Sequence, residues 1–194
     1  MSKITVDTVE PSTGTSLTLG ASGDTISVPS GATLESAGQP VTNAPAFEAY
    51  KNSTTGSLAD NTSTKVAFDV EVFDTDSAYD KDTNYRFTVP SGKAGKYHVY
   101  TTVYMFTAGG ATANEIQVGE LVIKLNGSST TAMVERNTNG YGNSITMQTA
   151  VTLSLSAGDY IEVWGKLDTA GVTWSIGGTT FQRTTFGAFR LIGV

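Results

Sequence analysis

The chain of 194 residues contains no cysteine. Disulfide bonds, thiolate metal sites and cysteine nucleophiles are therefore excluded. The single histidine, His98, stands between Tyr97 and Val99, which indicates a packed strand and not the cleft of a Ser-His-Asp site. No run approaches the roughly 20 apolar residues of a membrane span, and the first ten residues lack the apolar core of a secretory signal. We therefore expect a protein that starts in the cytoplasm, does not enter membranes and is not an enzyme.

Aromatic residues are missing from the first 46 positions. All eight Phe, eight Tyr and two Trp lie at or after Phe47, whereas four of the five prolines precede it. This shift predicts an N-terminal segment, 1–45, and a globular domain, 46–194. Within the segment, Ser16–Leu19 and Thr25–Val28 alternate in a way that predicts two short strands. Because one chain holds too few apolar residues for a core here, the segment is either disordered or a β-rich stalk formed by several identical chains.

Positive charge is in deficit, with 12 Lys and Arg against 18 Asp and Glu. The resulting negative field repels phosphate backbones, so we expect no nucleic-acid partner. Solubility is a sufficient explanation of this charge.

The domain from residue 46 onward is typical of an all-β fold, since it shows no helical periodicity. Its clearest alternation runs from Ile145 to Leu155, and the turn at Gly158-Asp159 then predicts a hairpin with Tyr160–Trp164. The ten predicted strands are 47–51, 65–69, 85–90, 97–107, 115–125, 132–136, 144–156, 160–166, 172–176 and 180–192.

Six residues between positions 66 and 106 follow a spaced pattern: Phe68, Asp74, Tyr79, Phe87, Gly95 and Tyr97. This pattern resembles the signature of the globular head of complement C1q and of the related tumour-necrosis-factor-like jelly rolls. Two of its gaps are longer here, by one and two residues, and both extensions fall in predicted turns. The hairpin ending at Trp164 and the closing stretch Phe186–Leu191 are similar to later strands of the family. The resemblance implies a ten-strand-type antiparallel β-sandwich, a jelly roll, that forms a homotrimer.

The strand 97–107 has no face that suits water. Tyr97, Val99, Thr101, Val103 and Met105 share one face, and His98, Tyr100, Thr102, Tyr104 and Phe106 share the other. A sandwich strand normally shows solvent a polar face, so the second face needs cover from another chain or from a loop. In the resembling family, the matching strand packs around a threefold axis. The residues expected at the trimer interface are His98, Tyr100, Tyr104, Phe106, Phe189 and Leu191.

Carboxylates concentrate between positions 69 and 82. Asp74, Asp76 and Asp80 offer the hard oxygen ligands that calcium prefers, but the tight-turn glycine of an EF-hand is absent. The alternatives are a weak calcium site and a solvated acidic loop. A glycosidase pair is not expected, because it needs a groove that fixes the two carboxylates at a set separation. No other cofactor is indicated.

The stretch 137–143, NTNGYGN, is the best candidate for contact with a receptor. The amides of Asn139 and Asn143 can donate and accept hydrogen bonds, and the ring of Tyr141 can stack on a sugar. An ordinary Asn-Gly hairpin loop explains the same residues.

The first 34 residues resemble the stalk or attachment segment of phage fibre and appendage proteins. Together with the head, this resemblance implies a virion protein, assembled in the host cytoplasm, that joins other virion proteins through residues 1–45. Its trimeric head would then recognise a host-surface glycan or protein. The alternatives are a virion decoration protein without a receptor, and a cellular C1q-like module that binds a protein or glycan.

Overall fold

The computed structural model describes residues 44–107, 116–140, 142–179 and 181–191, together with 9, 22–25, 27, 29–30, 32, 35–36 and 39–40. The chain separates into two compact units, Met1–Thr42 and Asn43–Val194. The composition shift predicts this boundary three residues later. In the described part of the chain, no helix is long and apolar enough to cross a membrane.

The first unit contains a two-stranded antiparallel sheet of β1 (Glu35–Ser36) and β2 (Gln39–Pro40). The sequence did not predict this pair. The predicted strand Ser16–Leu19 lies outside the described residues. Of the predicted strand Thr25–Val28, the described Thr25 and Ser27 are not in a strand.

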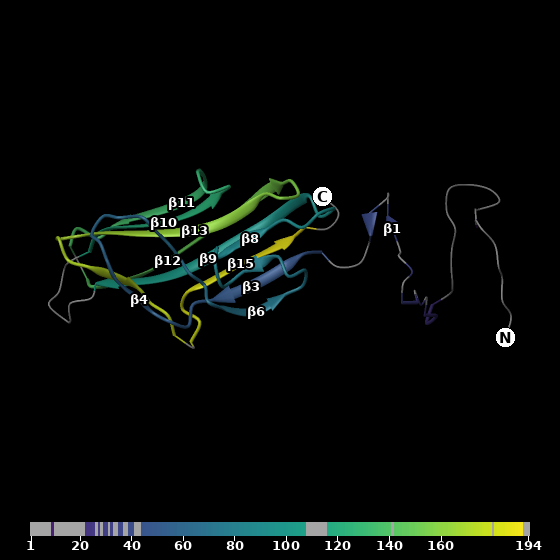
Figure 1. Cartoon of the computed structure of the whole chain (residues 1–194), viewed down its shortest axis with the longest axis horizontal. Coiled ribbons are helices and arrows are strands. Elements are labelled where there is room, and N and C mark those ends of the chain that lie inside the picture. Colours follow the sequence, from purple (N-terminus) through teal and green to yellow (C-terminus); the bar gives the residue numbers. More distant parts are fainter. Residues whose placement is uncertain are drawn as a thin grey trace. The chain divides into compact units, whose positions relative to one another are not determined.

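Sheet one of the second unit is organised around the long strand β9. Its strands are β3 (Ala46–Tyr50), β4 (Thr55–Leu58), β6 (Val70–Asp74), β9 (Gly95–Thr107), β12 (Ser144–Leu155), β14 (Trp174–Ile176) and β15 (Thr185–Arg190). Strand β12 pairs with β9 over its whole length. On the other edge of β9, β15 leads on to β3 and β6, and β14 leads on to β4 (Figure 1).

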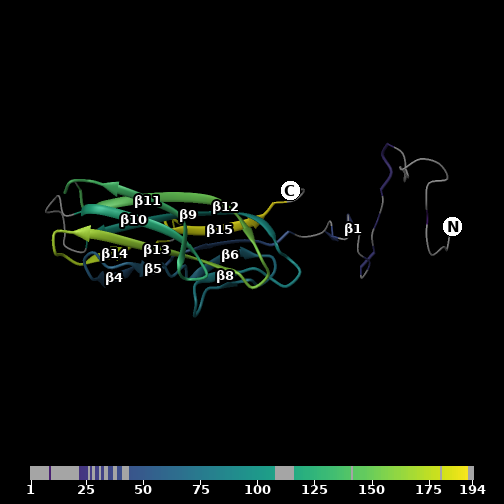
Figure 2. The same cartoon turned by 90° about the horizontal axis from the view of Figure 1, so that it is seen from above.

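Sheet two consists of β5 (Thr64–Lys65), β7 (Tyr79–Asp80), β8 (Arg86–Thr88), β10 (Ile116–Leu125), β11 (Ser129–Asn137) and β13 (Tyr160–Thr169). Its order is β11-β10-β13-β8-β7, and β5 also pairs with β13. All pairings in both sheets are antiparallel, and the two views in Figures 1 and 2 show the long strands stacked in layers. The prediction of an all-β antiparallel sandwich is confirmed.

The core between the sheets is built on aromatic rings. The ring of Phe47 stacks on Tyr79 and on Phe87, with centroids 4.9 Å apart in both pairs, and meets Phe186 edge-on at 5.0 Å. The hydroxyl of Tyr79 donates a 3.0 Å hydrogen bond to the carbonyl of Phe68. The spaced aromatic residues of the sequence pattern are therefore core residues that hold the two sheets together.

One strand prediction was wrong in an informative way. No single strand covers the predicted range 65–69. Strand β5 ends at Lys65 in sheet two, and β6 begins at Val70 in sheet one. Between them the chain crosses from one sheet to the other, and Val66 and Phe68 are fully buried on the way. Two buried apolar residues at alternate positions give the same sequence pattern as a half-buried strand, so the sequence predicted a strand here. The short strands β4 and β7 were not predicted.

Candidate functional site

The side of sheet one that points away from the core, here called the outward face, carries aromatic side chains. Along β9 the residues predicted to face inward are buried, and His98, Tyr100, Thr102, Tyr104 and Phe106 alternate with them as half-buried side chains. Phe189 of β15 pairs with His98, and cross-strand partners share a face. The structure therefore brings five of the six predicted interface residues together on one face.

A row of paired residues crosses the middle of this face. Phe73 of β6 pairs with Glu48 of β3, Glu48 with Gly187 of β15, and Gly187 with Tyr100 of β9. The Tyr100 hydroxyl donates a 2.7 Å hydrogen bond to Oε2 of Glu48. A Cβ atom at Gly187 would lie 2.4 Å from Cζ of Tyr100, so the absence of a side chain there gives the ring its place.

The environment of Tyr100 keeps its hydroxyl protonated. Burial raises the pKa of Tyr100, and the hydrogen bond to Glu48 and the negative charge of that carboxylate raise it further. The neutral phenol therefore acts as a donor to Glu48 at every physiological pH. The pair holds the ring flat across two strands.

His98 belongs to an aromatic cluster. The centroid of its ring lies 5.4 Å from that of Phe189 and 6.3 Å from that of Tyr100. Its Nδ1 lies 3.3 Å from Oγ1 of Thr152 on β12. These are contacts of a packed histidine in a strand, and its place at a subunit interface stays a prediction.

A second aromatic pair lies further along β9. The ring centroids of Tyr104 and Phe106 are 5.5 Å apart. A Cβ atom at Gly177 would lie 2.3 Å from Cδ1 of Tyr104, so the ring rests directly on the Gly177 backbone. The guanidinium of Arg183 lies 5.5 Å from the centre of the Tyr104 ring, within cation–π range.

The remaining predicted interface residue, Leu191, follows the end of β15. Its backbone N–H donates to the carbonyl of Lys96 at 2.8 Å, which places it beside the start of β9. The sequence reasoning did not identify Glu48 or Phe73 as parts of the outward face. The alternation in Phe47–Lys51 was a signal for Glu48, but the pairing with Phe73 depends on a bulge in β6.

The acidic turn is held by hydrogen bonds from its own backbone to its carboxylates. Asp74 accepts the backbone N–H groups of Asp76 and Tyr79, at 3.2 and 2.7 Å. Asp80 accepts those of Asp82 and Thr83, at 3.1 and 2.9 Å. Among the described residues, no group of three His, Cys, Asp or Glu side chains could hold a metal ion. Asp74, Asp76 and Asp80, the residues of the calcium hypothesis, therefore do not form such a group in this structure.

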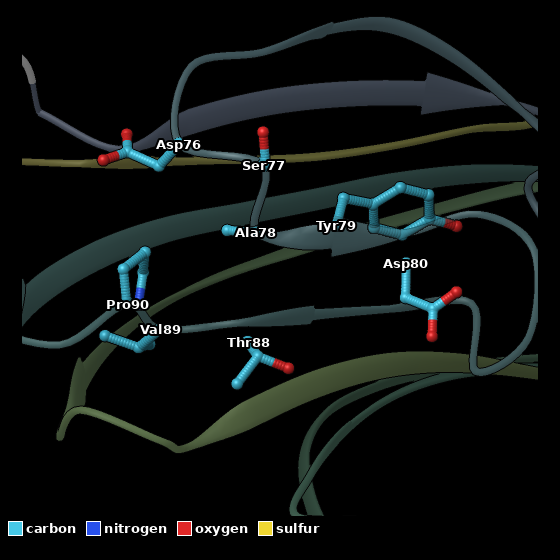
Figure 3. Close-up of a pocket in the computed structure, with 8 residues that line it drawn as sticks. All are labelled: Asp76, Ser77, Ala78, Tyr79, Asp80, Thr88, Val89 and Pro90. Carbon is cyan, nitrogen blue, oxygen red and sulfur yellow. The ribbon is translucent and has the colours of Figure 1, made fainter.

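An open hollow of about 310 Å³ lies beside this turn and is lined by residues 76–80 and 88–90 (Figure 3). The carboxylates of Asp76 and Asp80 stand at opposite sides of it in Figure 3. The ring of Tyr79 belongs to the core and is 5% exposed.

The candidate receptor loop connects β11 to β12. Asn139 and Gly140 have left-handed backbone angles, with φ of 49° and 77°, and the Asn139 N–H donates to the side chain of Asn137. The carbonyl of Asn143 accepts the N–H of Thr107, the last residue of β9. Tyr141 lies outside the described residues.

This loop and Pro45, the residue before β3, lie at opposite ends of β9. The carbonyl of Pro45 accepts the N–H of Arg190, and Lys96 near the start of β9 pairs with Leu191. The loop lies at Thr107, and the 13 residues of β9 span about 40 Å. The candidate receptor loop therefore lies at the end of the head opposite to Pro45.

Three solved structures share the fold of the head. The globular domain of zebrafish complement 1qA is 14% identical, with 76% of this chain and 97% of that chain covered, at a TM-score of 0.51. Murine APRIL at pH 5.0 is 15% identical, with 77% of this chain and 100% of that chain covered, at a TM-score of 0.54. Eiger TNF from S. frugiperda is 16% identical, with 78% of this chain and 94% of that chain covered, at a TM-score of 0.52. No protein-family model and no curated protein sequence matches the chain. At these identities the likeness establishes the C1q- and TNF-like jelly-roll fold alone.

Proposed function

We propose that this jelly-roll protein is a structural virion appendage, a phage tail fibre or a capsid-attached knob, whose head forms a homotrimer and contacts the host surface. The observation that carries the proposal is the aromatic outward face of sheet one. Phe73 is 46% exposed and Phe189 is 42% exposed in the single chain, beside the half-buried rings of Tyr100 and Tyr104. Apolar patches of this kind mark surfaces that another protein covers.

A threefold assembly covers this face without a second protein. Each copy presents the same face, so three copies around one axis bury all three faces in one closed arrangement. The resemblance to the C1q-like heads, whose matching strand packs around such an axis, supports this number. His98, Tyr100, Tyr104, Phe106, Phe189 and Leu191 are the residues that we assign to the interface.

The role in the virion rests on the N-terminal segment and on the position of the receptor loop. Residues 1–45 resemble fibre attachment segments, and we assign to them the contact with other virion proteins. The loop that contains Asn139 and Asn143 lies at the opposite end of the head from Pro45. A head attached through residues 1–45 would present this loop to a cell-surface glycan or protein.

In this proposal the head functions by binding and not by catalysis. We assign it no metal ion, no cofactor and no nucleic-acid partner, in keeping with its acidic composition. The fold is equally compatible with a decoration protein that binds no receptor, and with a cellular C1q-like module.

An adsorption experiment separates these functions. Purified protein is added to host cells together with the phage that encodes it, and adsorption of the phage is scored. A receptor-binding head binds the cells and lowers adsorption with increasing concentration. Protein that is found in purified virions but neither binds cells nor competes is a decoration protein. Absence from the virions would contradict both viral functions and favour the cellular module.

A further inference from the structure

Phe181 is the most exposed large apolar side chain in the described part of the chain. It is 82% exposed, whereas Phe189, on the outward face, is 42% exposed. It lies in the connection between β14 and β15, which projects from the lower edge of the head in Figure 1. Burial of this ring by a partner would be favourable, because it would remove apolar surface from water.

The base of this connection is fixed to the sheet. The hydroxyl of Thr184 donates to the carbonyl of Gly177 at 2.7 Å, and both groups are buried. Lys51 accepts the N–H of Thr179 at 3.1 Å and donates its own N–H to Thr184 at 2.9 Å. These bonds close the connection at its two ends.

Two hydrogen bonds to Thr179 hold the backbone at Phe181 and Gln182. The N–H of Gln182 donates to the carbonyl of Thr179 at 3.1 Å, and the N–H of Phe181 donates to Oγ1 of Thr179 at 2.9 Å. Gln182 has a φ of 51°, an unfavourable value for a residue with a side chain. A phenyl side chain has only two side-chain torsions, so it loses little conformational entropy when a partner buries it.

The connection borders the outward face. Its first residue, Gly177, lies under the ring of Tyr104, and Arg183 near its end lies 5.5 Å from the centre of the same ring. A molecule that covers Tyr104 therefore lies next to Arg183, which is two residues from Phe181 in the chain. A second copy of this chain is the molecule that the proposed trimer places there.

We propose that Phe181 is an intersubunit anchor, whose ring packs against the apolar surface of a neighbouring copy. This inference rests on the proposed homotrimer. In a threefold assembly the contact is repeated three times, from each copy to the next, and one ring contributes three times to trimer stability. Aromatic side chains at such positions are frequent hot spots of binding.

Sedimentation of the Phe181→Ala variant over a range of concentrations tests the proposal. We expect the concentration at which trimers dissociate to rise about tenfold or more. The matched control is Met133→Ala, since Met133 is 54% exposed but lies on β11 of sheet two. This control should dissociate at the wild-type concentration. Both side chains are exposed, so neither change should unfold the head.

A photo-crosslinking residue at position 181 gives a second, independent result. We expect irradiation to yield covalent dimers and trimers of the full chain from position 181 and none from position 133. A trimer that dissociates at the wild-type concentration in Phe181→Ala, with no crosslink from position 181, would overturn the anchor and leave the homotrimer standing. A wild-type protein that is monomeric would overturn both.

Discussion

The hydroxyl of Tyr100 reaches across β15 to donate a 2.7 Å hydrogen bond to Oε2 of Glu48 on β3. The ring passes over Gly187, which has no side chain to obstruct it. Three strands of sheet one are thereby joined on the face that we assign to the trimer. The position of the Tyr100 ring on this face depends on that glycine.

Gly187→Ala should destabilise the head by about 1 to 3 kcal/mol, because the new methyl group would displace the Tyr100 ring. Urea unfolding measures the change. In a Tyr100→Ala background the same substitution should be less harmful, and the two changes should couple by about 0.5 to 3 kcal/mol. Strictly additive effects would mean that the ring does not occupy this place.

Much of the sandwich could be predicted because its strands alternate over long stretches. Strand β9 was predicted at 97–107 and observed at Gly95–Thr107, and β12 was predicted within one residue. The crossing at Val66 and Phe68 could not be predicted, since a buried connection and a half-buried strand show the same alternation. Strand β4 pairs with β14, more than 110 residues further along the chain, and a local pattern does not encode such a partner. Strand β7 has only two residues, too few to show an alternation.

Asp69 should make the head sensitive to acid. Burial raises the pKa of Asp69, but the backbone N–H groups of Asn52 and Ser53 and the charge of Lys51 together hold it below its usual value. A pKa lower in the folded state stabilises the head above the unfolded value of about 3.9, and this stabilisation is lost as the pH falls through the folded value.

The measurement is urea unfolding of wild type and Asp69→Asn at pH 7 and at pH 3. The wild type should be the more stable at pH 7, and the difference should narrow at pH 3. Asp82→Asn is the control, since the Asp82 side chain is 76% exposed, and we expect little change from it at either pH. If the difference in unfolding free energy between wild type and Asp69→Asn were equal at both pH values, the lowered pKa of Asp69 would not contribute to stability.

Calcium should not stabilise the protein. The carboxylates of Asp74 and Asp80 each accept backbone N–H groups within the turn, and among the described residues no three carboxylates come together as a ligand group. We expect the thermal midpoint to be the same with a calcium chelator and with millimolar calcium. A rise of several degrees that saturates at one ion per chain would restore the calcium site.

The candidate site was predicted less completely than the fold. The sequence placed His98, Tyr100, Tyr104 and Phe106 on one face because a strand has a period of two. Glu48 and Phe73 were not predicted on this face, because their positions depend on the order of the strands and on a bulge. The exposure of Phe181 was not predicted, because the predicted strand 180–192 included this residue, whereas β15 begins at Thr185.

The receptor loop can be tested without disturbing its turn. Asn139→Gly removes the amide side chain and keeps the left-handed backbone that Asn139 adopts. If the loop contacts the receptor, this variant, Tyr141→Ala and Asn143→Ala should each compete less well with phage for host cells. Asn126→Gly is the control, since Asn126 also precedes a glycine in a left-handed turn, at the opposite end of β10. The Asn126 side chain bonds to Asp159 and Tyr160, so thermal unfolding of this variant checks that the head is still folded. Equal competition by all four variants would move the contact to another loop.

The mass of the protein in solution tests the trimer most directly. At micromolar concentration, light scattering should give about 61 kDa, three times the 20.3 kDa of the chain. Tyr100→Asp should shift the mass toward that of one chain, because it places an unpaired charge in the covered face. A wild-type mass of one chain at that concentration would contradict the account, and a trimer that survives Tyr100→Asp would place the interface on another surface.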